Sequence, residues 1–233
     1  MVIQIDRETL EEVRKMFRNL EGNVILRFFR PSGECRFCED TEKIVEILSS
    51  LSDKISYEIL EEGSSLADKF NVDMFPALLV HGEKEYNVRF FGIPAGYEFG
   101  ALIEDIIDVS RGRPSLSEKL AKIVAEKIKK RVRIMVFVTP TCPYCPLAVR
   151  TAHKLAMANP LITGDMIEAL EFEELANQYS VYAVPKNVIK VDGEDALEFE
   201  GAAPDPYFIA QIFKALKEPL PEELLDDISN SEI

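Results

Sequence analysis

Apolar positions along this chain are spaced as in a helix in some segments and form the apolar run of a buried strand in others. This order of segments occurs twice. Residues 6–20 predict a helix, and the apolar run at 23–29 that follows has the length and residue types of a buried strand. The same pair of a helix and an apolar strand is predicted again at 115–130 and 132–138. The hydrophobic pattern therefore divides the chain into two similar halves.

After its first strand, each half continues with the same elements. They are a helix led by a Cys-x-x-Cys pair, a strand, a short helix, a hairpin of two strands and a closing helix. The predicted ranges are 35–51, 55–60, 65–70, 76–91 and 96–109 in the first half, and 142–157, 166–171, 173–179, 185–200 and 206–217 in the second. A parallel strand–helix–strand unit followed by an antiparallel hairpin predicts an α/β fold, with a mixed central sheet flanked by helices in each of two tandem units.

Three pairs of residues fix the length of this repeat. The first cysteines are 107 residues apart, and two prolines and two glycines are each 109 residues apart: Cys35 and Cys142, Pro76 and Pro185, Gly92 and Gly201. A capping-box pattern at 115–118 opens the second half after a boundary at 111–114. The predicted organisation is a first unit at 1–113, a second unit at 114–217 and an acidic tail at 218–233.

Composition and charge limit the possible functions. The 233 residues suit two domains of about 100 residues, and the net charge of −14 argues against nucleic-acid binding, which needs a clustered positive surface. No apolar run reaches the roughly 20 residues of a membrane span, and the N-terminal segment has no signal-peptide pattern. We therefore expect a cytoplasmic protein with no membrane partner. A charged fraction of 29% without tryptophan is typical of a thermophile.

All four cysteines lie in two pairs, each placed between a predicted strand and a predicted helix. The pairs are Cys35-Arg-Phe-Cys38 and Cys142-Pro-Tyr-Cys145. A cysteine at a helix start meets unpaired backbone N–H groups and the positive end of the helix dipole, which favour the thiolate. A second cysteine one turn later can resolve a mixed disulfide. The pairs therefore predict an enzyme that exchanges dithiols and disulfides at two sites.

A strand, a Cys-x-x-Cys pair at a helix start and a proline about 40 residues later together resemble the thioredoxin fold. The second pair, with Thr141 before it, is similar to the glutaredoxin signature. The tandem arrangement resembles the protein disulfide oxidoreductases of thermophilic archaea and bacteria. This resemblance implies two units packed into one body. It also implies reduction, oxidation and isomerisation of protein disulfides, comparable to protein disulfide isomerase.

The resemblance further implies roles for individual residues. The nucleophiles would be Cys35 and Cys142, and the resolving thiols Cys38 and Cys145. The residues beside them that hold the substrate chain would be Phe75 with cis-Pro76 and Val184 with cis-Pro185. Thioredoxins carry a buried acid six residues before the first cysteine, but this chain has Phe29 and Val136 there.

The expected partners are proteins with thiols or disulfides and, by the same resemblance, a flavoprotein similar to thioredoxin reductase. NADPH and FAD would belong to that reductase, because this chain has no glycine-rich dinucleotide motif. Redox-active disulfides are therefore the only redox groups expected in the chain itself, without a further cofactor or a metal.

Two other classes of function stay open on the sequence. Apolar surface around the sites would suit a chaperone-like binding module, and cysteine pairs also bind zinc or iron–sulfur clusters. However, the 103 residues between Cys38 and Cys142 exceed the spacing of a zinc ribbon. His81 and His153 are distant in sequence from the cysteines and are predicted to lie on the surface.

The two cysteine pairs differ in the charge of their neighbours. Three acids and one base surround the first pair: Glu34, Glu39, Asp40 and Arg36. No charged residue occurs from Thr139 to Val149 around the second pair. Because negative charge opposes thiolate formation, Cys142 is predicted to be the more reactive nucleophile.

Overall fold

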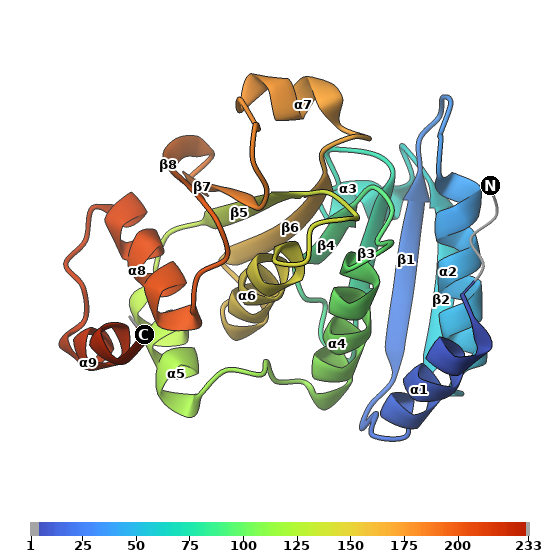
Figure 1. The fold of residues 1–233 in the computed structure, drawn as a ribbon, viewed down its shortest axis with the longest axis horizontal. Helices are drawn as coiled ribbons and strands as arrows, with labels where there is room; N and C mark the ends of the chain where they lie inside the picture. Colours follow the sequence, from blue (N-terminus) through green and yellow to red (C-terminus); the bar gives the residue numbers. More distant parts are fainter. Residues whose placement is uncertain (1–4, 232–233) are drawn as a thin grey trace.

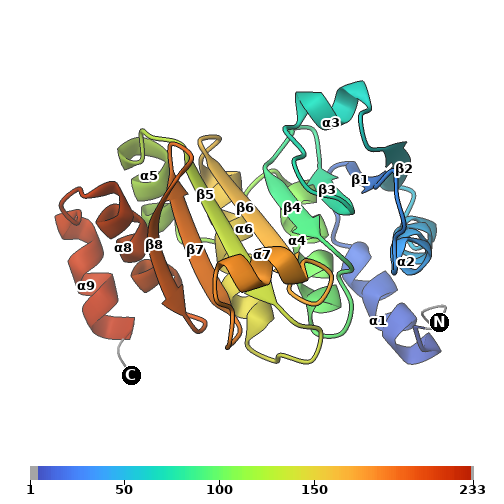
Figure 2. The ribbon, with the colours of Figure 1, turned by 90° about the horizontal axis from the view of Figure 1, so that it is seen from above.

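Eight strands from both halves of the chain form one continuous sheet in the computed structural model, which describes residues 5–231 (Figure 1). The strand order is β2-β1-β3-β4-β6-β5-β7-β8, and Figure 2 shows the strands following one another in this order. The two halves meet where β4 and β6 pair in parallel. The two predicted sheets are therefore joined edge to edge.

The order of elements is the same in both halves. The first half contains α1 (Arg7–Phe17), β1 (Val24–Arg30), α2 (Cys38–Ser50), β2 (Ile55–Glu61), α3 (Ser65–Lys69), β3 (Ala77–His81), β4 (Val88–Phe91) and α4 (Glu98–Arg111). The second half contains α5 (Glu118–Lys127), β5 (Val132–Val138), α6 (Cys145–Ala158), β6 (Ile162–Glu168), α7 (Glu173–Gln178), β7 (Lys186–Val191), β8 (Glu194–Glu200) and α8 (Asp205–Leu216). A last helix, α9 (Glu222–Ser231), lies in the acidic tail.

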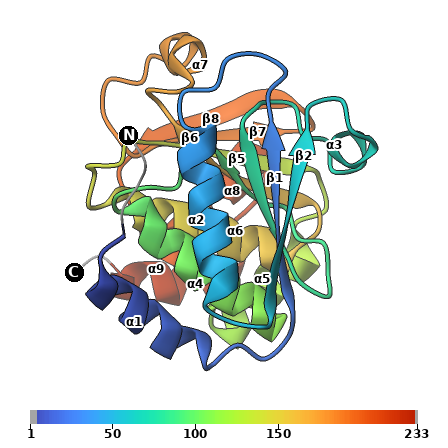
Figure 3. The ribbon, with the colours of Figure 1, turned by 90° about the vertical axis from the view of Figure 1, so that its right-hand side faces the viewer.

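Alternate residues of each strand face opposite sides of the sheet, so the sheet has a core on each side. In β5, Ile134, Val136 and Val138 face the larger core, whereas Met135 and Phe137 face the smaller one. The larger core is covered by α1, α2, α4, α5, α6 and α8, and the smaller core by α3 and α7. In Figure 3, α4 and α6 lie on one side of the strands and α3 on the other.

Strand directions bring the two cysteine pairs to one edge of the sheet. β4 pairs antiparallel with β3, which pairs antiparallel with β1, so β4 and β1 run in the same direction. β4 pairs in parallel with β6, and β6 with β5. The carboxyl ends of β1, β4, β6 and β5 therefore lie at the same edge, and the segments that carry Cys35 and Cys142 both leave from it.

One predicted strand is displaced in the structure. The sequence placed the second strand of the second half at 166–171, but β6 covers Ile162–Glu168. Gly164 lies inside this strand. A Cβ atom at Gly164 would be 2.7 Å from the carbonyl oxygen of Ala152 in α6. The glycine therefore lets helix α6 approach the sheet closely, and it does not end the strand.

Charged side chains stabilise the joint between the halves. Arg89 in β4 and Asp165 in β6 are register partners, and Nε of Arg89 donates to Oδ1 of Asp165 at 2.7 Å. Arg133 in β5 donates to the other oxygen of Asp165 at 2.6 Å and also binds Asp73 of the first half. Burial alone would raise the pKa of Asp165, but Arg89 and Arg133 hold that pKa below its usual value.

Both histidines are buried, which corrects the prediction that they lie on the surface. Nδ1 of His153 lies 2.6 Å from Oδ2 of Asp105, and its Nε2 lies 3.2 Å from the carbonyl oxygen of Arg89. Nδ1 of His81 lies 2.6 Å from Nη1 of Arg27. Burial, together with the charge of Arg27, lowers the pKa of His81 to about 4. Hydrogen bonds thus offset the cost of placing these imidazoles in the interior.

Helix α9 packs on the second half through Leu224, which is fully buried. Two ion pairs connect this helix to α5, between Lys127 and Glu223 at 3.1 Å and between Lys119 and Asp227 at 2.8 Å. Between residues 5 and 231, no helix has the length and apolar character needed to cross a membrane.

Candidate active site

Each Cys-x-x-Cys pair forms a disulfide in the turn between a strand and a helix. The Cα atoms are 5.5 Å apart in both Cys35–Cys38 and Cys142–Cys145. Helix α2 begins at Cys38 and α6 at Cys145, so the second cysteine of each pair, and not the first, is the first helical residue. The first cysteine lies in the turn before the helix, within reach of the unpaired N–H groups of its first turn.

Exposure distinguishes the two sulfur atoms of each pair. Cys142 is 9% exposed and Cys145 is fully buried. Cys35 is partly exposed, whereas Cys38 is 1% exposed. A substrate can therefore reach the first cysteine of each pair more easily than the second. Both pairs form disulfides, as the sequence led us to expect.

The matched prolines Pro76 and Pro185 immediately precede strands β3 and β7. The Phe75–Pro76 and Val184–Pro185 peptide bonds are both cis, as predicted. The carbonyl oxygen of Val184 lies 3.7 Å from Sγ of Cys142. In the second half, the residue before the proline is therefore directly beside the sulfur atom that the sequence marks as the nucleophile.

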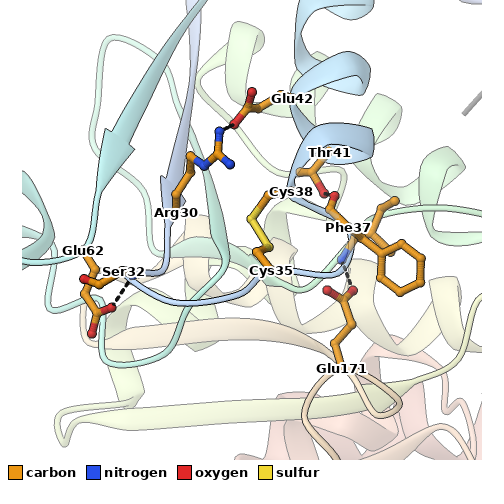
Figure 4. The surroundings of a disulfide bond; sticks show 10 residues. Arg30, Ser32, Cys35, Phe37, Cys38, Thr41, Glu42, Glu62 and Glu171 are labelled. Carbon is orange, nitrogen blue, oxygen red and sulfur yellow. Dashed lines mark hydrogen bonds and ion pairs between the residues drawn. A yellow bond between two sulfur atoms is a disulfide. The ribbon is translucent and has the colours of Figure 1, made fainter. Parts of the chain in front are cut away.

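Polar contacts order the segment around the first pair (Figure 4). The hydroxyl of Thr41 donates to the carbonyl oxygen of Phe37 at 2.9 Å, which fixes the start of α2. Arg36, between the cysteines, stacks on the ring of Phe37, with 4.9 Å from its Cζ atom to the ring centroid. The side chain of Arg36 is exposed and brings a positive charge beside Cys35.

Two buried glutamates and one partly buried glutamate lie at the same sheet edge as the cysteine turns, and the sequence did not reveal them. They are Glu98 at the start of α4, Glu168 at the end of β6 and Glu171 in the following loop.

Glu98 is 1% exposed and neither of its carboxylate oxygens has a hydrogen-bond partner. Burial and the carboxylate of Asp105 raise the pKa of Glu98 to about 8. Its neighbour Tyr97 donates its N–H to the carbonyl oxygen of Pro140, two residues before Cys142.

Glu171 comes from the second half but reaches the first cysteine pair. Its carboxylate accepts the N–H of Ile93 at 2.6 Å, and Figure 4 shows it directed towards the Cys35–Cys38 turn. The neighbouring Gly92 donates its N–H to the carbonyl oxygen of Pro76, so the Gly92–Ile93 segment connects Glu171 with the first proline. Burial raises the pKa of Glu171 to about 7, although the N–H of Ile93 and the charge of Arg36 act against this increase.

The thioredoxin pattern could not reveal these acids, because it predicts a carboxylate six residues before the cysteine on the same strand. That position is occupied by the apolar core residues Phe29 and Val136. The acids near the cysteine turns instead come from helix α4, from the end of β6 and from the β6–α7 loop. No cluster of three or more His, Cys, Asp or Glu side chains within residues 5–231 is arranged to hold a metal ion.

Comparison with known proteins supports this description of the fold. The family model of the thioredoxin domain matches residues 132–214. An NADH dehydrogenase of Bacillus subtilis is 27% identical over 192 residues, which are 82% of this chain and 35% of the relative. The alkyl hydroperoxide reductase AhpF of Staphylococcus aureus is 25% identical over 191 residues, which are 82% of this chain and 34% of the relative. The chain thus spans about a third of the length of these curated relatives.

Two solved structures cover nearly the whole chain. A protein disulfide oxidoreductase from Aeropyrum pernix has a TM-score of 0.82 and 27% identity, and the match covers 95% of this chain and 98% of that chain. The N-terminal domain of alkyl hydroperoxide reductase AhpF from Enterococcus faecalis has a TM-score of 0.78 and 22% identity, over 89% of this chain and 99% of that chain. These matches confirm the tandem thioredoxin fold and the resemblance to protein disulfide oxidoreductases.

Proposed function

We propose that this tandem thioredoxin-fold protein catalyses thiol–disulfide exchange on protein substrates at two sites, Cys35–Cys38 and Cys142–Cys145. One observation carries the proposal: both pairs are disulfides at one edge of the sheet, and in each the first cysteine is more exposed than the second. A nucleophile must reach its substrate, whereas a resolving thiol acts only inside the complex.

The reduction of a substrate disulfide then proceeds in two steps at the second site. The thiolate of Cys142 attacks one substrate sulfur, the substrate S–S bond breaks, and a mixed disulfide forms. Cys145 next loses its proton and attacks Sγ of Cys142, which restores the protein disulfide and releases the reduced substrate. Two electrons pass from the cysteine pair to the substrate. Oxidation of a substrate is the reverse sequence.

The proposal also assigns roles to the residues that precede strands β3 and β7. Val184 and Phe75, with Pro185 and Pro76, would hold the incoming chain by backbone pairing beside the sulfur atoms. The 3.7 Å between the carbonyl oxygen of Val184 and Sγ of Cys142 supports this role in the second half. The units proposed to carry the two sites are residues 1–113 and 114–217, followed by the tail at 218–233.

A flavoprotein reductase is the proposed source of electrons. The curated relatives are named for NADH dehydrogenase and alkyl hydroperoxide reductase activity, and each is about three times as long as the matched segment. The name of the first relative refers to NADH and the name of the second to a reductase, which supports a reductase as the electron source. We expect NADPH and FAD to act in a separate thioredoxin-reductase-like protein, and we place both proteins in the cytoplasm.

Insulin reduction with dithiothreitol tests the main proposal. The double variants Cys35→Ser with Cys38→Ser, and Cys142→Ser with Cys145→Ser, each leave one site intact and should retain part of the activity. Replacement of all four cysteines should reduce the rate to that of dithiothreitol alone. A four-serine variant as active as the natural protein would refute the proposal.

A chaperone-like binding module is a second candidate, because large apolar side chains are exposed near the second site. Tyr144 is 66% exposed, Leu147 59% and Tyr182 93%. The four-serine variant separates the two functions, since suppression of aggregation that persists without cysteines requires only this surface.

A further inference from the structure

The grooves beside the two sites differ in their charge. Next to the first site, a groove of about 580 Å³ runs between helix α7 of the second half and the loop that precedes Pro76 in the first half. The residues that line it include Met74, Leu170, Glu171, Phe172, Glu173 and Glu174. Met74 immediately precedes Phe75, which the proposed function assigns to pairing with the substrate. A substrate chain that pairs with Phe75 would therefore lie beside this groove.

Within the part of the chain that the structure describes, two of the three carboxylates in this groove have no ion-pair partner, whereas the charge of Arg36 acts on Glu171. Glu173 and Glu174 are exposed, and within residues 5–231 neither forms an ion pair. Glu34 and Glu39, which flank the first cysteine pair, are also exposed. Against these acids, Arg36 is the single base in the Cys-x-x-Cys turn, and it stacks on Phe37.

The groove beside the second site provides the contrast. It measures about 950 Å³ and includes Pro143, Pro146 and Leu147 at the cysteine turn. Its charged side chains are already paired, because Lys154 binds Asp205 at 2.6 Å and Arg150 binds Glu104 at 3.1 Å. A charged residue of a substrate would find no unpaired partner of opposite sign among these four.

We propose that the first site is selective for substrate segments with lysine or arginine near the reacting cysteine, and that the second site is not. This inference rests on the proposed function, because it specifies which substrates the first site accepts. Residues two positions apart in an extended chain are about 7 Å apart and point to the same side, so side chains flanking a cysteine at the sulfur can enter the adjoining groove. Exposed carboxylates attract a cation modestly and in a salt-dependent way.

The test uses variants in which only one site works. Cys142→Ser with Cys145→Ser isolates the first site, and Cys35→Ser with Cys38→Ser isolates the second. Each reduced variant is mixed with disulfide-linked peptide dimers that carry lysine, glutamine or glutamate two positions before and after the cysteine. The second-order rate constant for oxidation of the protein is then measured at low salt and at high salt.

At low salt, the first site should react about tenfold faster with the lysine peptide than with the glutamate peptide, and high salt should reduce this ratio to below about twofold. The second site should show a ratio within about twofold under both conditions. In the first-site background, Glu173→Gln with Glu174→Gln should lower the ratio at least about threefold. The matched control, Glu8→Gln with Glu12→Gln, removes two exposed carboxylates from α1, which lies at the bottom of Figure 1 whereas α7 lies at its top, and should leave the ratio unchanged.

Equal rates for the lysine and glutamate peptides at the first site would overturn the inference, as would a ratio that survives the replacement of Glu173 and Glu174. A failure of the proposed function has a different result. In that case neither single-site variant would react with any of the peptides faster than the four-serine variant does.

Discussion

Arg89 of β4 and Asp165 of β6 face each other across the joint between the two halves and form two hydrogen bonds, at 2.7 and 2.9 Å. Both side chains are buried, and Arg133 binds the same carboxylate. The two halves are thus connected by a charge cluster whose members come from three strands. Breaking a buried ion pair leaves a charge without a partner in a medium of low polarity, which is costly.

Asp165→Asn should therefore lower the free energy of unfolding by about 3–5 kcal/mol. Glu11→Gln is a suitable control, because it removes the exposed pair between Arg7 and Glu11 and should cost less than about 1 kcal/mol. Urea denaturation monitored by circular dichroism measures both. The pKa of Asp165 is lowered in the folded protein, so its contribution is present above the unfolded value and is lost as the pH falls through the folded value. Equal losses in the two variants would mean that this cluster does not stabilise the joint.

Glu98 should make the protein less stable as the pH rises. Its pKa is raised from 4.5 to about 8 by burial and by Asp105, so the folded state keeps a proton that the unfolded state releases above 4.5. The contribution of Glu98 to the free energy of unfolding is therefore fully present below pH 4.5 and is lost as the pH rises to 8. We expect the natural protein to lose on the order of 3 kcal/mol more than Glu98→Gln between these pH values. Denaturant titrations at several pH values measure the difference, with the exposed Glu12→Gln as control.

The sequence predicted most of this fold because its signals are local. The spacing of cysteines, prolines and glycines fixed the repeat, and the apolar runs located the strands of the first half. The displaced strand β6 shows the limit of this approach, because Gly164 is required by the approach of α6, a contact between distant segments. For the same reason, the sequence could not reveal that Glu171 of the second half would lie at the first cysteine pair. Which acid enters which site depends on the pairing of β4 with β6.

Gly164 and Gly100 should respond in opposite directions to replacement by alanine. A Cβ atom at Gly164 would lie 2.7 Å from a backbone oxygen of α6, so Gly164→Ala should lower the free energy of unfolding by about 1–3 kcal/mol. Gly100 lies inside α4 with nothing within 4 Å of the new atom. Because alanine has the higher helix propensity, Gly100→Ala should increase stability by about 0.5–1 kcal/mol. Thermal unfolding of the two variants gives the sign directly, and a stabilised Gly164→Ala protein would contradict the close packing of α6.

Cys142 should react faster than Cys35 with an alkylating reagent at neutral pH. The charged neighbours of Cys35 are mainly negative: Glu34 and Glu39 are exposed beside it, and Glu171 approaches from the other half. Negative charge opposes formation of the thiolate, which is the reactive form. The segment around Cys142 has no charged residue, so the N–H groups at the start of α6 act there without this opposition.

Two partial variants make this comparison possible. Cys35→Ser with Cys38→Ser leaves the second pair, and Cys142→Ser with Cys145→Ser leaves the first. Both variants are reduced and then labelled with iodoacetamide over a pH range of about 5 to 9, because this range spans the usual pKa of a thiol. Labelling of Cys142 should reach half of its maximal rate at a pH at least about one unit lower than labelling of Cys35, and mass spectrometry of the labelled peptides identifies the modified residue. Cys142 is only 9% exposed, and burial favours the neutral thiol. A higher midpoint for Cys142 than for Cys35 would therefore mean that burial outweighs the helix terminus and the acids around the first pair.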